Sequence, residues 1–65
     1  MKITVNGQQK EVISDNLKEI IETLGFDVNN YVVILNDEIV PKSKLIETRI
    51  KENDSIEILT IMGGG

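Results

Sequence analysis

The chain has 65 residues, a formal net charge of −4, and neither cysteine nor histidine. A chain of this length forms one small domain, which buries only about 60% of the surface that its unfolded form exposes. Without thiols and imidazoles it has no disulfides, no thiolate nucleophile, and neither the usual general base nor the usual metal ligand. An acidic surface with only two aromatic residues also argues against nucleic-acid binding, and favours a protein partner with a basic face.

The opening stretch predicts a β-hairpin. Residues 2–5 alternate between polar and apolar, which is the period of a half-buried strand. Asn6-Gly7 follows, a strong signal for a tight turn because both turn positions need positive φ. The return strand is expected over residues 8–13. The pattern leaves open whether Val12 or Ile13 points inward.

A helix is predicted next. Its apolar residues recur at the spacing of one helical face: Leu17, Ile20, Ile21 and Leu24. Asn16 can cap the helix, and Glu19 three residues later completes a pattern like a capping box, although Ser14 and Asp15 compete as caps. Gly25 stands where a left-handed C-cap residue belongs, and Phe26 is expected to fold back onto the core.

The second half of the sequence predicts further strands around an irregular segment. Residues 31–35 form a nearly continuous apolar run, as in a central strand covered on at least part of both faces. The other expected segments are a turn at 36–38, a short strand at 39–40 ended by Pro41, a helical turn at 42–46, an extended piece at 48–50 and a last strand at 55–62.

This order of elements favours an α+β fold. One helix packed across one face of a small mixed sheet is the simplest way to bury a single apolar stripe. We expect four to five strands, with the first and last as parallel central neighbours, which is the arrangement of a β-grasp. The predicted domain covers residues 1–62, and residues 63–65 form a flexible glycine tail.

Three glycines, Gly63, Gly64 and Gly65, end the sequence. A terminal glycine run closes no turn, but it can form a thin extended strand that enters a narrow slot. We therefore interpret the tail as the working part of the chain. The alternative is an inert, frayed chain end.

The last strand carries a candidate docking surface. Leu59 and Ile61 have the parity of Glu57, opposite to Ile56 and Ile58. If Ile56 and Ile58 face the helix, then Leu59 and Ile61 form an exposed apolar patch beside the tail. The alternative is a bulge near Leu59 that turns one of them into the core.

Several classes of function find no support in the sequence. It contains no nucleophile beside a general base and no phosphate-binding glycine loop, and its acidic turns lack the spacing of a calcium loop. No segment resembles a signal peptide or a membrane span. We therefore expect a cytoplasmic protein that is not an enzyme and holds no metal.

The whole chain resembles the ThiS family, the small sulfur-carrier proteins of thiamine biosynthesis, which have the ubiquitin-like β-grasp fold. The resemblance rests on residues 1–6 with the Asn-Gly turn, the helix with Gly25, the segments 36–42 and 53–58, and the final Gly64-Gly65 pair. Gly63 stands where family members often have another small residue.

The resemblance implies a mechanism centred on Gly65. An adenylyltransferase of ThiF type would bind the domain, thread Gly63 and Gly64 toward ATP, and adenylate the Gly65 carboxylate. A persulfide donor would displace AMP and leave a thiocarboxylate, whose sulfur a thiazole synthase of ThiG type would use. The chain would then be a carrier without a bound cofactor, and a monomer when free.

Three other functions remain open at this point. The small subunit of molybdopterin synthase resembles the same fold and tail, although residues 39–42 favour ThiS. A plain interaction module with an inert tail and a ubiquitin-like modifier that conjugates to proteins are the others.

Overall fold

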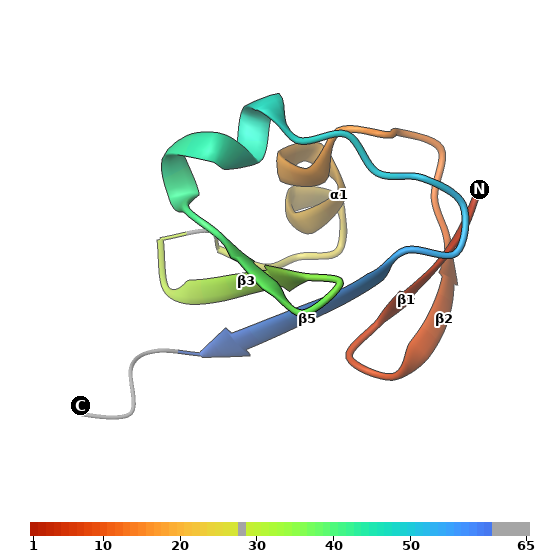
Figure 1. The fold of residues 1–65 in the computed structure, drawn as a ribbon, viewed down its shortest axis with the longest axis horizontal. Helices are drawn as coiled ribbons and strands as arrows, with labels where there is room; N and C mark the ends of the chain where they lie inside the picture. Colours follow the sequence, from red (N-terminus) through yellow and green to blue (C-terminus); the bar gives the residue numbers. More distant parts are fainter. Residues whose placement is uncertain (28, 61–65) are drawn as a thin grey trace.

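The computed structural model describes residues 1–27 and 29–60. Its five strands form one sheet in the order β2-β1-β5-β3-β4. The strands are β1 (Lys2–Val5), β2 (Gln8–Glu11), β3 (Tyr31–Leu35), β4 (Glu38–Val40) and β5 (Ser55–Thr60). Helix α1 (Leu17–Thr23) and the 3-10 helix η1 (Lys42–Glu47) lie on the same side of this sheet (Figure 1). The predicted mixed sheet with one main helix is confirmed.

The two central strands, β1 and β5, run parallel, and the other strand pairs of the described sheet are antiparallel. The predicted pairing of the first and last strands is therefore confirmed. It places the last strand inside the sheet, between β1 and β3. The predicted boundary between the domain and the tail, at residues 62 and 63, lies outside the described residues.

The first hairpin turns as its sequence predicts. Asn6 and Gly7 have φ values of 51° and 82°, so both adopt the left-handed region that this turn requires. Strand β2 ends at Glu11, two residues earlier than expected. The next residue, Val12, donates its N–H to the carbonyl of Met1 at 2.9 Å and is buried, whereas Ile13 is fully exposed. This contact decides which of the two apolar residues enters the core.

Asn16 caps α1, as predicted. Its Oδ1 accepts the N–H of Glu19 at 3.1 Å. The backbone N–H of Asn16 donates to Ser14 Oγ at 3.0 Å, so Ser14 takes the place that a capping box gives to the glutamate side chain. At the other end Gly25 has a φ of 93°, and its N–H donates to the carbonyl of Glu22 at 3.0 Å. The predicted left-handed C-cap is confirmed.

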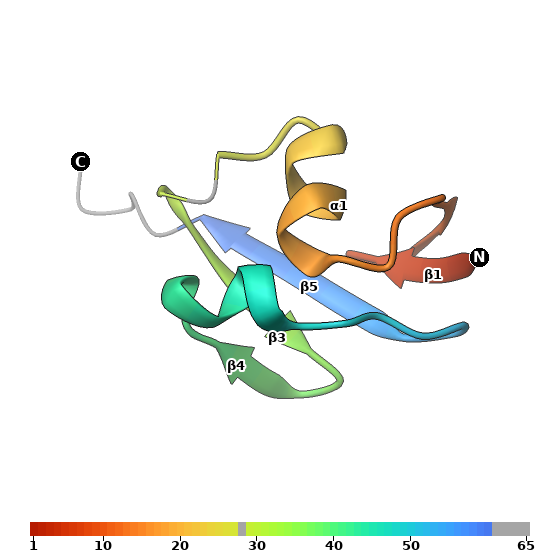
Figure 2. The same ribbon diagram turned by 90° about the horizontal axis from the view of Figure 1, so that it is seen from above.

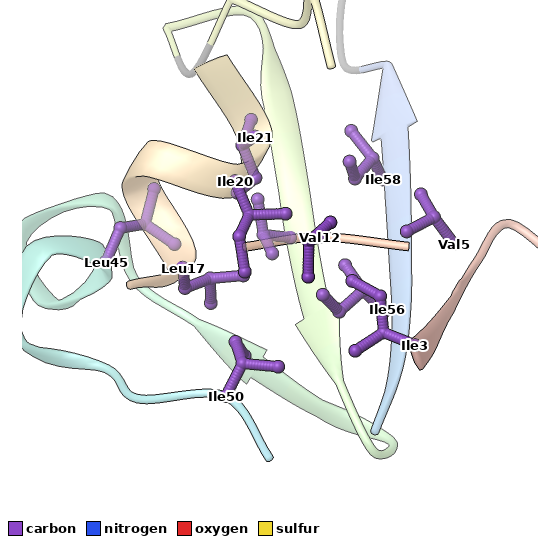
Figure 3. Packing of buried hydrophobic residues seen from close by; sticks show 11 residues of the cluster. Ile3, Val5, Val12, Leu17, Ile20, Ile21, Leu45, Ile50, Ile56 and Ile58 are labelled. Carbon is purple, nitrogen blue, oxygen red and sulfur yellow. The ribbon is translucent and has the colours of Figure 1, made fainter. Parts of the chain in front are cut away.

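The core lies between α1 and the sheet. Figure 3 shows the apolar side chains of the helix directed toward those of the two central strands. The buried apolar residues are Ile3, Val5, Val12, Leu17, Ile20, Ile21, Val33, Leu45, Ile50, Ile56 and Ile58. Phe26 packs against this cluster and contacts Tyr31 edge-to-face, with ring centroids 5.2 Å apart. Its predicted return to the core is confirmed.

The second hairpin has a shorter turn than predicted. Asn36 and Asp37, with φ values of 48° and 73°, make the whole turn, and Glu38 already pairs with Leu35. Asn36 also fastens this turn to the start of β5, because its Nδ2 donates to the buried carboxylate of Asp54 at 3.1 Å. The expected helical turn after Pro41 is η1, which runs to Glu47.

The arrangement of the core predicts a large contrast between two isoleucines. Ile20 is 1% exposed inside the core, so Ile20→Ala should lower the free energy of unfolding by about 2–5 kcal/mol through lost burial and a residual cavity. Ile13→Ala is the matched control, because Ile13 is fully exposed, and it should change that free energy by less than about 0.5 kcal/mol. Urea denaturation measures both, and similar losses would contradict the placement of the core.

Candidate functional site

Strand β5 carries the chain out of the centre of the sheet toward its glycine end. On one side it pairs with β3 along almost its whole length, from Leu35 opposite Ile56 to Tyr31 opposite Thr60. Strand β5 is thus an interior strand, between β1 and β3, although its pairing with β1 ends at Ile56. Residues 61–65 lie outside the described residues, so the roles of Ile61, Gly63, Gly64 and Gly65 stay predictions.

The side chains of β5 alternate between the two faces of the sheet. Ile56 and Ile58 face α1 and are buried, whereas Leu59 points to the other face and is 48% exposed. The register with β3 is unbroken from Ile56 to Thr60, so the alternative of a bulge near Leu59 is wrong. The predicted exposure of Leu59 is confirmed, and its docking role stays a prediction.

Leu59 has apolar neighbours on the same outer face. It lies opposite Val32, and Ile34 lies opposite Ile39. Val32 and Ile34 are half-buried, and Ile39 is 69% exposed. We call these four residues, Val32, Ile34, Ile39 and Leu59, the outer-face patch. It spans three neighbouring strands of the sheet, β5, β3 and β4.

The outer-face patch has no cover in the described part of the chain. Helices α1 and η1 both lie over the opposite face, as Figure 2 also shows from above. The apolar run of β3 was predicted to be covered on at least part of both faces, and its outer residues Val32 and Ile34 are half-buried, although neither α1 nor η1 lies over them. An apolar group of this kind on one face is typical of a contact site.

One carboxylate lies within this surface. Glu57 has the parity of Leu59 on β5 and lies opposite Ile34. It is exposed. A partner surface with an apolar centre and a basic group near Glu57 would match the patch in both polarity and charge.

The described residues offer few other chemical groups. In residues 1–27 and 29–60 no three acidic side chains gather closely enough to hold a metal ion. Among the helices of the same residues, none is both long and apolar enough to cross a membrane.

The model of the ThiS family matches residues 3–65. The chain belongs to the ThiS family. The predicted resemblance is thereby confirmed, and as a ThiS protein the chain is a sulfur carrier of thiamine biosynthesis and not a catalyst.

Individual ThiS proteins agree with this assignment over their whole length. A crystal structure of the thiamine biosynthesis protein ThiS from Geobacter metallireducens superposes with a TM-score of 0.85 at 33% identity, covering 100% of both chains. The sulfur carrier protein ThiS of Thermus thermophilus is 25% identical over 63 residues, which cover 97% of this chain and 98% of that protein.

A longer relative also contains this domain. The thiazole synthase of Paramagnetospirillum magneticum is 33% identical over 66 residues, which span 100% of this chain but only 20% of that protein. The ThiS chain thus corresponds to about a fifth of the length of that thiazole synthase.

Adjacent residues of β5 should respond differently to the same charge. Ile58→Glu places a carboxylate in the core and should unfold the domain, because an unpaired buried charge costs several kcal/mol. Leu59→Glu places it on the outer face and should leave the melting temperature within a few degrees of the parent. Thermal melts followed by circular dichroism test this pair, and a collapse of the Leu59 variant would contradict the outward orientation of Leu59.

Proposed function

We propose that this ThiS protein carries sulfur as a thiocarboxylate on Gly65 and delivers it for the formation of a thiazole ring. The observation that supports this proposal most is the position of the outer-face patch beside the end of β5, just before the glycine tail. A partner that binds the patch would bring Gly65 within its reach. Family membership supplies the sulfur chemistry.

The proposed loading has two stages. First, an oxygen of the Gly65 carboxylate attacks the α-phosphorus of ATP on a ThiF-type adenylyltransferase, forming an acyl-adenylate and releasing pyrophosphate. The terminal sulfur of a persulfide then attacks the acyl carbon and AMP leaves, after which a thiol reduces the remaining S–S bond and frees the thiocarboxylate. The partners supply the ATP, the bases and the sulfur, and we expect these steps in the cytoplasm.

A glycine tail suits this task for a physical reason. Without side chains, Gly63 and Gly64 can pass through a narrow channel that would reject a larger residue. Ordering such flexible residues costs binding free energy. Burial of the outer-face patch against the partner would offset that cost, since burial of apolar surface contributes roughly 25 cal/mol per Å².

The relative from Paramagnetospirillum supports a thiazole synthase of ThiG type as the acceptor. That protein bears the name thiazole synthase and includes a stretch similar to the whole of this chain within a much longer polypeptide. A carrier and an acceptor joined in one chain are expected to work on each other. The present chain would then offer its sulfur to an acceptor of the same kind.

The central test is the mass of the protein after loading. Incubation with ATP, the ThiF-type enzyme and a persulfide donor should raise the intact mass by the difference between one sulfur and one oxygen. Fragmentation should place this change on Gly65. A version with one residue added after Gly65 is the control, and it should stay unmodified. No sulfur in the parent, or equal loading of the extended version, would contradict the proposal.

A substitution in the tail tests threading separately. Gly64→Ala adds a methyl group inside the proposed channel and should slow adenylation by roughly tenfold or more, because small misplacements of a reacting group are costly. The free energy of unfolding should be unchanged. Pyrophosphate exchange measures the rate of adenylation. Ser43→Ala is the control, because Ser43 is an exposed residue of η1. Equal rates for Gly64→Ala and the parent would count against a threaded tail.

A further inference from the structure

Strand β1 ends before its neighbour β5 does. Their pairing runs as far as Val5 opposite Ile56, and the N–H of Asn6 donates to the carbonyl of Ile56 at 2.9 Å. The chain then turns away at Asn6-Gly7, while β5 continues to Thr60. A continued parallel strand would next offer a carbonyl to the N–H of Ile58 and an N–H to its carbonyl. The turn removes the backbone that would do so.

The side chain of Asn6 takes over both of these bonds. Its Oδ1 accepts the N–H of Ile58 at 2.8 Å, and its Nδ2 donates to the carbonyl of Ile58 at 3.4 Å. The orientation of the amide follows from the first bond, because a backbone N–H needs the oxygen as its acceptor. The second bond is longer and weaker. One primary amide thus extends the ladder between β1 and β5 by one further residue of β5.

We propose that Asn6 is a positioning residue for the glycine tail. Without its side chain, the Ile58 backbone would lose both bonds on the β1 side and would keep its pairing with β3. A strand end that is held on one side only opens from its sheet more often, so the direction of β5 beyond the outer-face patch would be less fixed. With the amide in place, β5 stays in the plane of the sheet up to Ile58, two residues before Thr60. The inference rests on the proposed function, since it concerns the direction in which the tail would approach the activating enzyme.

The residue type at position 6 fits this double task. Asn6 has a φ of 51°, a conformation that asparagine tolerates better than most other residues. Glycine would also accept this backbone but would leave the N–H and the carbonyl of Ile58 without the amide. Aspartate keeps an acceptor for the N–H but loses the donor. Asparagine alone of these three serves both the turn and the ladder.

Asn53 provides a matched control. It also has a positive φ, of 71°, and its backbone N–H donates to the carbonyl of Lys2 at 2.7 Å. It is exposed, and its turn lies just before the start of β5, at the opposite end of that strand from the tail. Asn53→Gly therefore repeats the change from asparagine to glycine at positive φ without touching Ile58.

The test combines kinetics with hydrogen exchange on the full chain. Adenylation by the ThiF-type enzyme is measured for the parent, Asn6→Gly, Asn6→Asp and Asn53→Gly. For Asn6→Gly we expect kcat to fall about tenfold, because the tail is misaligned. KM should stay within about twofold, because the outer-face patch remains to bind the enzyme. The amide of Ile58 should exchange faster in Asn6→Gly than in the parent. Both kcat and this exchange rate should be intermediate in Asn6→Asp. In Asn53→Gly both should equal those of the parent.

The outcomes separate this inference from the function on which it rests. An inactive parent would refute the proposed function itself. An active parent with an equally active Asn6→Gly variant would overturn only the positioning role. Equal losses of kcat in Asn6→Gly and Asn53→Gly would also overturn it, because they would reflect a general loosening of the domain. Unchanged exchange at Ile58 would show that the side chain does not hold this part of β5.

Discussion

The parallel pairing of β1 with β5 is the constraint on which the rest of the molecule depends. The first and last strands meet in the middle of the sheet, with β2 outside one of them and β3 and β4 outside the other. The chain can therefore begin with a hairpin and still place β5 in the interior of the sheet. The start of β5 is held by strands on both sides, and the Asn6 side chain extends this hold to Ile58, which fixes the direction in which the strand runs. This is the property that a carrier with a reactive end requires.

The two faces of the sheet differ in burial, and we assign stability to one and the proposed recognition to the other. One face buries Ile56 and Ile58 against α1, while the other exposes Leu59 and its apolar neighbours. A domain of this size has little stability to spare, so it cannot easily support a strained catalytic pocket. Leaving the chemistry to a partner avoids that cost.

Much of the fold could be predicted because its signals are local. The Asn6-Gly7 turn, the cap of α1 and the glycine that ends it each depend on residues a few positions apart, and all were confirmed. The alternation of β5 likewise placed Leu59 on the open face. The choice between Val12 and Ile13 could not be made, because it depends on a bond to Met1 eleven residues away.

The rest of the site could not be predicted for the same physical reason. Val32, Ile34 and Ile39 join Leu59 only through the register of β3 with β4 and β5, and sequence alternation does not give that register. The apolar run of β3 also fits a strand buried on both faces equally well. Similarly, the hairpin turn explains Asn6 completely at the level of sequence. Its contact with Ile58 becomes visible only when residues far apart in the chain are brought together.

The most direct measurement of whether the body and the tail act as one site is a titration of the isotopically labelled chain by NMR. The ThiF-type enzyme would be added without ATP. Amide signals of Leu59, Ile39 and the terminal glycines should shift or broaden together, while those of Lys18 and Glu22 on the exposed side of α1 should stay in place. Changes centred on α1, or on the glycines without Leu59 and Ile39, would contradict a carrier that docks through the outer face of its sheet.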